Sequence, residues 1–231
     1  MSTETRTNPD PGVLSKTSPD VVLQWAKPPQ QERSQNTHDR LIEAAERLVG
    51  GGRSWSDIGV QELVKEAGTS VGAFYNRFRD KDALLHILQI SLYQEGEVTA
   101  ANAHALAALD VPLEALVRAF VSLAVQVYRQ QHGIRRALLL EMFTNRQFRD
   151  RAVALSKLTC EGLCDVLHQR HPAIDRATLR TSVDVAHRII YGTLDQNLMY
   201  EDAPTDHVLA DSTMIEELVV AVHAYLERRL I

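Results

Sequence analysis

The stretch that decides the fold is AGTSVGAFYNRFRDKDALL, Ala67 to Leu85. A glycine, Gly68, stands before Thr69 and Ser70, and glycine lets a chain reverse through left-handed backbone angles without a Cβ clash. Ser70 is a favourable N-cap for a helix. The helix that follows opens with small residues, Val71–Ala73, before its aromatic residues. We therefore predict a tight turn followed by a short, slender helix.

Two further helices are predicted ahead of this turn. Apolar residues from Leu41 to Val49 recur at the spacing of one helix face, and the run Gly50–Gly52 ends that helix. A second apolar set from Val60 to Ala67 predicts a shorter helix, which closes at the glycine turn. Three short helices with a glycine-bearing turn between the second and the third are typical of a helix-turn-helix unit, whose third helix enters the major groove of DNA.

Helix signals continue to the C-terminus. Asp80 caps a long helix that starts at Lys81, and Pro112 lies near the first turn of the next one. Further helices are predicted over residues 134–143, 145–170, 175–200 and 205–230, and alternating strand patterns are absent. We predict an all-α chain of about nine helices. It divides into a disordered tail over 1–35, a helix-turn-helix domain over 36–83 and an effector-binding and dimerisation domain over 84–231.

The composition sets limits on partners. Hydrophobic residues make up 45% and charged residues 24% of the 231-residue chain, as in ordinary globular proteins. The net charge of -5 gives no general attraction to nucleic acid, so a DNA site requires a local patch. Residues 36–81 hold seven Lys/Arg and seven Asp/Glu. No apolar run has membrane-spanning length and no secretory signal is present, so we expect a cytoplasmic protein without a membrane partner.

Enzymatic and metal chemistry find no support in the sequence. Glycine-rich phosphate loops, Ser/His/Asp groupings and paired carboxylates on one apolar face are missing. Cys160 and Cys164 lie one helical turn apart without further ligands at zinc spacing. Buried reduced thiols are the simpler interpretation, and a redox switch is the alternative. We expect no enzyme, no cofactor and no metal.

The quoted stretch, together with RLIEAAERLV over residues 40–49, resembles the signature of the TetR family (TetR-type) of transcriptional regulators. The resemblance covers Arg40 to about Leu85 and implies an Ω-shaped homodimer that binds double-stranded DNA and a small-molecule effector. Gly59 stands where the family usually has a phosphate-binding Thr or Ser, so that contact is lost or moved to Ser56 or Thr69. The residues that the resemblance assigns to DNA binding are Val71, Gly72, Ala73 and Asn76 near base edges, Tyr75, Arg77 and Lys81 on phosphates, and Ser70 beside them.

The C-terminal domain is expected to hold the effector and the dimer surface. Six residues are candidates for effector binding: Phe120, Tyr128, Met142, Phe143, His187 and Tyr191. For His187, a satisfied core or interface histidine is the alternative. A loose basic run is either a solvated surface or a site for an anionic effector: Arg129, Arg135, Arg136, Arg146, Arg149 and Arg151. The last two helices are the expected dimer surface, with Leu218, Val222 and Leu226 on the apolar face of the final helix.

Two functions remain open at this point. The first is a ligand-responsive, homodimeric DNA-binding regulator, a repressor that a small-molecule effector releases from a pseudo-palindromic operator. The second is a helical ligand- or partner-binding protein whose N-terminal unit no longer reads DNA. The first is the hypothesis we favour, and the missing hydroxyl at Gly59 and the neutral charge balance of the helix-turn-helix segment keep the second open.

Overall fold

The computed structural model describes residues 32–51, 53–107 and 111–230. This part of the chain contains nine α-helices, one short 3-10 helix and no strand, which confirms the predicted all-α class. The elements are α2 (Glu32–Gly50), η2 (Trp55–Asp57), α3 (Val60–Glu66), α4 (Val71–Tyr75), α5 (Lys81–Ala107), α6 (Leu113–Gln130), α7 (His132–Thr144), α8 (Arg146–Arg170), α9 (Arg176–Met199) and α10 (Asp211–Leu230). Residues 1–31 of the predicted tail lie outside the described residues. Residues 32–35, also predicted as tail, belong to α2.

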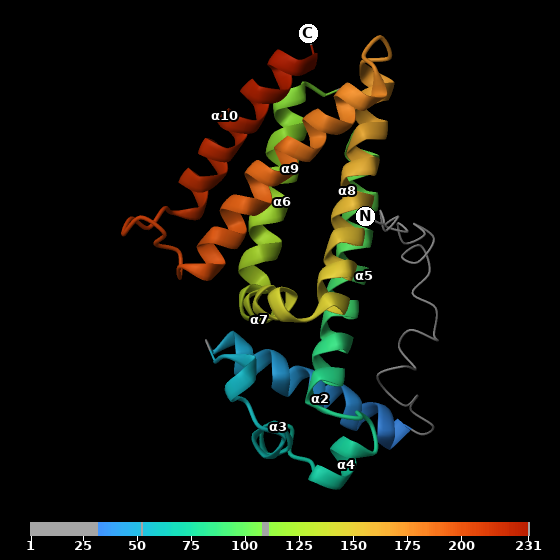
Figure 1. Cartoon of the computed structure of the whole chain (residues 1–231), viewed down its shortest axis with the longest axis vertical. Coiled ribbons are helices and arrows are strands. Elements are labelled where there is room, and N and C mark those ends of the chain that lie inside the picture. Colours follow the sequence, from blue (N-terminus) through green and yellow to red (C-terminus); the bar gives the residue numbers. More distant parts are fainter. Residues whose placement is uncertain (1–31, 52, 108–110, 231) are drawn as a thin grey trace, which may run out of the picture.

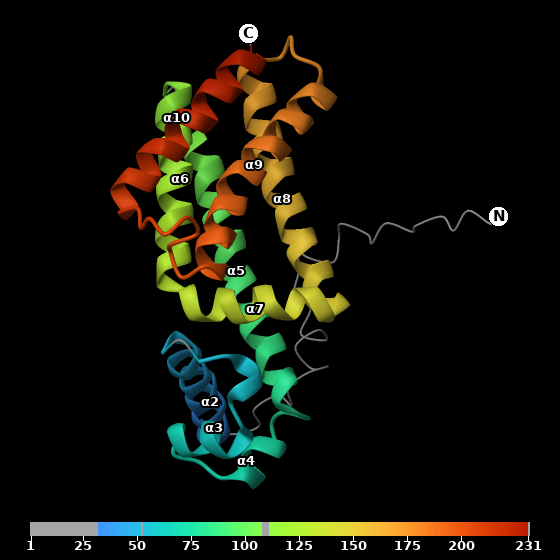
Figure 2. The same cartoon turned by 60° about the vertical axis from the view of Figure 1, so that its left-hand side comes forward.

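The helices form two groups joined by α5 and α7. Helices α2, α3 and α4 make one end of the molecule, and α6, α8, α9 and α10 run upright at the other (Figures 1 and 2). Helix α5 leaves the first group and continues alongside α8 in the second. Helix α7 runs crosswise between the two groups and packs on α2, α8 and α9.

The turn at Gly68 has the predicted geometry. Its φ is +58°, and a Cβ at this position would lie 2.3 Å from Arg40 Nη2. The same Nη2 donates a hydrogen bond to the Gly68 carbonyl at 2.8 Å. Ser70 Oγ accepts from the Ala73 amide at 3.1 Å, which confirms the N-cap of α4.

A hydrophobic core ties the helix-turn-helix unit to the helices above it. Phe74 and Phe78 are fully buried, with ring centroids 5.5 Å apart. The same cluster includes Trp55 before α3, Leu138 on α7 and Phe148 on α8. The unit is therefore packed against the second group of helices and does not rest on its own small core alone.

A second core fills the upright bundle and corrects one expectation. Leu218, Val222 and Leu226 of α10, expected on the dimer surface, are buried inside the chain against the other helices of this cluster. Helix α10 packs on α6 and α9. An apolar helical face in a sequence predicts that the face is buried, but not whether a second subunit or the same chain covers it. Here the covering residues come from the same chain. On the outer face of α10, Val220 remains 63% exposed.

The two cysteines are buried on α8, and burial raises the pKa of Cys160 to about 11 and also raises the pKa of Cys164. Both thiols are therefore protonated near neutral pH, in agreement with the buried-thiol interpretation. None of the helices in the described ranges is long and apolar enough to span a bilayer.

Replacing Gly68 with alanine is expected to lower the free energy of unfolding by about 1–2 kcal/mol, because a side chain would be forced into left-handed backbone angles. Arg40 would also have to move. Chemical denaturation of the full chain measures the loss. Gly72→Ala is the matched control from the same unit, since its added Cβ meets only Ser70 Oγ, at 4.0 Å. Equal stability of the two variants would contradict the role assigned to Gly68.

Candidate nucleic-acid interface and ligand cavity

Helix α4 presents one face outward and buries the other. Phe74 is fully buried, whereas Val71 is 40% and Tyr75 is 52% exposed. Ser70, Gly72 and Asn76 are also exposed, and Ala73 is half-buried. The face that the sequence assigned to base edges is therefore accessible.

The exposed face of α4 is slender. Gly72 has open space around its Cα, because an added Cβ would have no neighbour closer than 4.0 Å. The Tyr75 ring packs edge-on against Phe74, with centroids 5.3 Å apart. This contact supports the aromatic ring while half of the side chain stays exposed. A helix of this shape fits the width of a B-DNA major groove.

Arg77 and Lys81 lie differently from the other predicted DNA-binding residues. Arg77 is only 6% exposed, and Asp39 of α2 supplies a negative charge that acts on its guanidinium. Lys81 is half-buried at the start of α5. Both cationic groups therefore interact within the helix-turn-helix unit, and neither projects freely into solvent.

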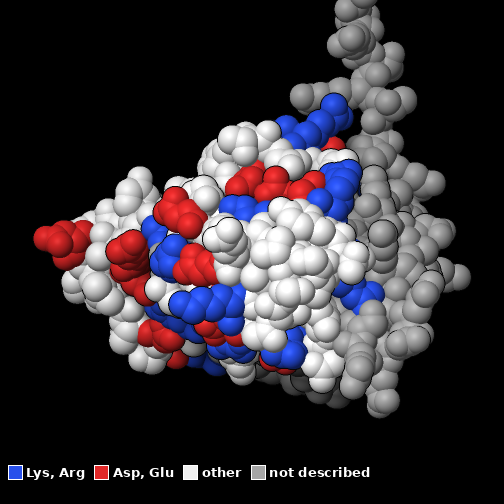
Figure 3. All heavy atoms as spheres, turned by 90° about the horizontal axis from the view of Figure 1, so that it is seen from below, with Lys and Arg blue, Asp and Glu red and all other residues white. Residues whose placement is uncertain are grey.

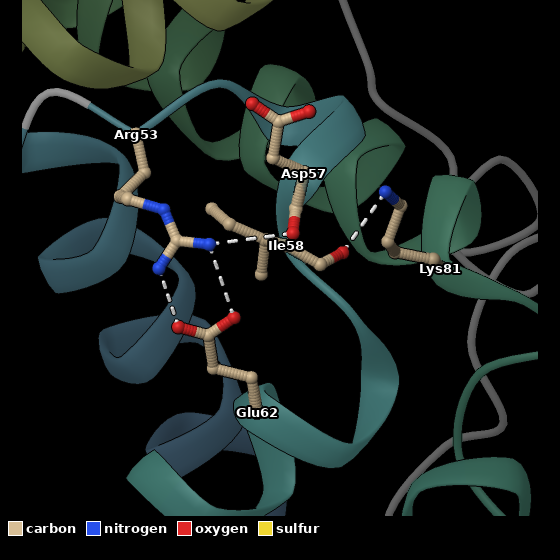
Figure 4. Close-up of polar contacts among 5 residues, drawn as sticks. All are labelled: Arg53, Asp57, Ile58, Glu62 and Lys81. Atoms are coloured by element: carbon tan, nitrogen blue, oxygen red, sulfur yellow. Dashed lines mark hydrogen bonds and ion pairs between the residues drawn. The ribbon is translucent and has the colours of Figure 1, made fainter.

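The Lys81 amine binds the backbone of the segment before α3. Its Nζ donates to the carbonyls of Trp55 at 2.6 Å, Ile58 at 3.0 Å and Ser56 at 3.4 Å. Figure 4 draws the bond to Ile58. The Nζ atom also lies 5.2 Å from the centroid of the Trp55 ring. All three ammonium donors thus have acceptors within the protein, and a phosphate would have to compete with them.

Arg53 fixes the same segment from the other side. Its Nη1 and Nη2 donate to the two carboxylate oxygens of Glu62 at 2.6 and 3.3 Å, and Nη2 also donates to the Asp57 carbonyl at 3.3 Å (Figure 4). Gly59, the N-cap of α3, offers no side chain for capping. The sequence reasoning missed this contact, although an arginine after the glycine run and a glutamate in the first turn of α3 were a usable signal.

Charges of both signs share the end of the molecule that carries α3 and α4. Figure 3 shows Lys and Arg interspersed with Asp and Glu on this face, without one continuous basic patch. Lys65 in the last turn of α3 is exposed, and no described carboxylate lies within 4.0 Å of its Nζ. It is a candidate phosphate contact that the sequence reasoning did not select.

A cavity of about 320 Å³ lies among α5, α6, α7, α8 and α9. Five of the six predicted effector-binding residues line it: Phe120, Tyr128, Met142, His187 and Tyr191. Phe143 is 70% exposed and is not among the lining residues. Because each helical residue rotates about 100° from the last, Met142 faces the cavity and its neighbour Phe143 faces away.

The polar lining of the cavity includes an arginine and a carboxyl group. Tyr128 donates its hydroxyl hydrogen to Asp195 Oδ1 at 2.9 Å. The Arg135 guanidinium carbon lies 4.3 Å from the centroid of the Tyr128 ring. Arg135 was predicted only within the basic run, and Asp195 was not predicted at all.

His187 forms part of an aromatic wall. Its ring centroid lies 4.4 Å from that of Tyr191, and burial lowers the pKa of His187. The imidazole is therefore neutral at physiological pH. The structure places it both against the bundle core and on the cavity, so the two interpretations of this histidine are compatible.

Comparisons with known families agree with this arrangement. Residues 41–88 match the family model of bacterial regulatory proteins of the tetR family, and residues 112–226 match the tetracyclin repressor-like C-terminal domain. The chain belongs to the TetR family of transcriptional regulators, which are DNA-binding proteins and not enzymes. No protein of curated function matches the sequence significantly.

Solved structures share the fold at low sequence identity. A regulator assigned to the TetR family from Mesorhizobium loti MAFF303099 aligns with a TM-score of 0.67 and 13% identity over 85% of this chain and 98% of that one. A TerR/AcrR-family regulator from Aquifex aeolicus VF5 aligns with a TM-score of 0.58 and 17% identity, over 81% and 98% of the chains. FadR from Bacillus subtilis, in complex with stearoyl-CoA, aligns with a TM-score of 0.52 and 16% identity, over 83% and 96%.

Replacing Lys81 with methionine is expected to lower the melting temperature of the full chain by about 2–6 °C, because three carbonyls lose a charged donor. Arg79→Met is the matched control, since Arg79 is 69% exposed beside Asp80 and such surface pairs contribute little. On DNA, the expected slope of log affinity against log salt is unchanged for Lys81→Met. A slope reduced by about one, at unchanged melting temperature, would instead show direct phosphate contact.

Proposed function

We propose that this chain is a homodimeric, ligand-responsive repressor. Each protomer reads one half of a pseudo-palindromic operator through α4, and a small-molecule effector in the cavity releases the dimer from DNA in the cytoplasm. Residues 36–83 are the DNA-binding domain and residues 84–231 the effector-binding and dimerisation domain. The observation that carries the proposal is the outward, slender face of α4 on a TetR-family chain.

The proposed DNA contacts divide into two kinds. Val71, Gly72, Ala73 and Asn76 face the base edges, where small side chains allow close approach and the amide can bond a base. Ser70 and Tyr75 offer hydroxyl groups to phosphate oxygens. Arg77 and Lys81 act mainly by holding α2, η2 and α5 in register, since their cationic groups already interact with Asp39 and with the carbonyls before α3.

The cavity is suited to control the DNA-binding end because α7 touches both. Arg135, Leu138, Leu139 and Met142 of α7 line the cavity. On the same helix, an added Cβ at Gly133 would lie 2.4 Å from the Val49 carbonyl oxygen and 2.6 Å from Gly50 Cα at the end of α2. A ligand that displaces α7 would therefore displace α2. The FadR structure with stearoyl-CoA shows a small molecule held by a protein of this fold.

The expected coupling between effector and operator is about 1–3 kcal/mol, a range that corresponds to roughly 5–150-fold in affinity. Such coupling is reciprocal, so operator DNA must weaken effector binding by the same factor. Two conformations that differ in the α2–α7 contact are sufficient to produce this coupling, because packed interfaces move between discrete arrangements.

Replacing Tyr75 with phenylalanine tests the DNA contact while leaving the ring on Phe74. A duplex selected by the wild-type protein from a random pool serves as probe. We expect about tenfold weaker binding, from loss of one hydrogen bond to a charged acceptor, and an unchanged salt slope. Tyr200→Phe is the matched control, because Tyr200 is 60% exposed at the C-terminal end of α9, outside the helix-turn-helix unit.

The same titration tests the homodimer and the alternative function. A repressor of this kind binds two protomers to a two-half-site duplex and loses most affinity when one half-site is scrambled. If the wild-type protein enriches no duplex and binds all DNA weakly, DNA reading is excluded. The helical ligand- or partner-binding protein, which the mixed charges in Figure 3 favour, then becomes the better hypothesis.

Replacing Gly133 with alanine tests the α7 contact. The added methyl group meets backbone atoms of Val49 and Gly50, so α2 and α7 must separate. We expect DNA affinity to fall by about tenfold, within the usual range of allosteric coupling, while the chain still melts cooperatively. Gly50→Ala is the matched control on the same seam, since its Cβ meets nothing within 4 Å. Wild-type affinity in Gly133→Ala would exclude this route of control.

A further inference from the structure

The six arginines of the basic run have different surroundings in the structure. Three are paired on the surface: Arg129 with Asp202 at 2.6 Å and Asp211 at 2.7 Å, Arg136 with Glu201 at 3.2 Å, and Arg146 with Asp150 at 3.2 Å. Arg149 is exposed on α8. Arg151 points inward, where it donates to His86 Nδ1 at 2.8 Å and to Gln89 Oε1 at 2.7 Å. Arg135 lines the cavity.

Arg135 lacks an acidic partner. Its Nε donates to Gln131 Oε1 at 3.2 Å, and no carboxylate among the described residues lies within 4.0 Å of its guanidinium nitrogens. The guanidinium rests on the face of Tyr128, which leaves its edge for a ligand. The carboxyl group of Asp195 acts on Arg135 by charge but makes no direct ion pair with it. A partly buried cation without a direct ion pair can gain from an anionic ligand at its free edge.

The rest of the cavity is mainly apolar. Its described walls include apolar side chains from α5, α6, α7 and α8: Leu92, Leu123, Val127, Leu138, Leu139 and Leu155. A volume of about 320 Å³ lies at the lower end of the range for ligand sites. The cavity therefore offers one cationic group, Arg135, and an apolar space that can hold the hydrocarbon part of a small ligand.

Further charges around the cavity act in both directions, with Arg151 favouring an anion and Asp195 opposing one. Burial raises the pKa of Tyr93 on the cavity wall, and the positive charges of Arg135 and Arg151 oppose this increase. Asp195 is the acidic group in the lining. Burial raises the pKa of Asp195, whereas the hydrogen bond from Tyr128 and the positive charge of Arg135 oppose that increase.

We propose that the cavity binds an amphiphilic monocarboxylate, with its carboxylate on the Arg135 guanidinium and its apolar chain along the leucines of α5, α6, α7 and α8. This inference rests on the proposed function insofar as the cavity is the effector site. It adds the chemical class of the effector. A guanidinium donates two parallel hydrogen bonds to a carboxylate, which gives both affinity and a fixed orientation.

Three probes that share one apolar chain and differ in their head groups test the proposal: decanoate, decylammonium and decanol. Isothermal titration of the full-length protein without DNA is expected to show decanoate binding at least tenfold tighter than the other two. Arg135→Gln should remove this preference by weakening decanoate alone, and Arg135→Lys should restore part of it. Asp195→Asn should tighten decanoate binding, because a residual negative charge is removed.

Arg136→Gln is the matched control, since Arg136 is the next residue on α7, pairs with Glu201 and is not among the lining residues. It should bind decanoate as the wild type does. Any one of four results would overturn the proposal. These are tighter binding of decylammonium than of decanoate, equal binding of all three probes, no binding of any probe, and an unchanged preference for decanoate in Arg135→Gln. If decanoate binds through Arg135 and leaves DNA affinity unchanged, the ligand class stands and the proposed effector release fails.

Discussion

The three hydrogen bonds from the Lys81 amine to the carbonyls of residues 55, 56 and 58 anchor the arrangement on which the rest depends. Lys81 is the first residue of α5, and these carbonyls lie in and after η2, directly before α3. One side chain thus fixes the angle at which α5 leaves the helix-turn-helix unit. Since α5 continues to the cavity wall at Leu92 and Tyr93, these bonds act together with the shared core around Phe74 and Phe148 to hold the helix-turn-helix unit against the cavity-bearing helices.

Helix α7 provides a second connection between the two ends, of a different physical kind. Where Lys81 acts through charged hydrogen bonds, Gly133 acts through close backbone contact with Val49 and Gly50. A glycine is needed there because any side chain would occupy the space of the α2 backbone. In the proposed mechanism, a ligand in the cavity shifts these two contacts between discrete arrangements and leaves both helix groups folded.

The proposed preference of the cavity for a carboxylate rests on Arg135, which forms no ion pair with a described residue. Three arginines of the basic run, Arg129, Arg136 and Arg146, have acidic partners near the surface, where the high dielectric makes such pairs contribute little. Arg135 lies among aromatic and aliphatic groups, where an unpaired cation interacts more strongly with an opposite charge. Asp195, held by Tyr128, limits how strongly positive the site becomes.

The sequence by itself determined the features that depend on local order along the chain. Helical periodicity, the glycine at the turn and the Ser70 cap predicted the all-α class and α3 and α4 correctly, because their causes lie within a few residues. Tertiary structure alone decided which groups cover which faces. It turned the apolar face of α10 inward, buried Arg77, engaged Lys81 with residues far away in the chain, excluded Phe143 from the cavity and placed Asp195 in it. Periodicity shows that a helical face is apolar or charged, whereas its partner is chosen by packing between segments that are distant in sequence.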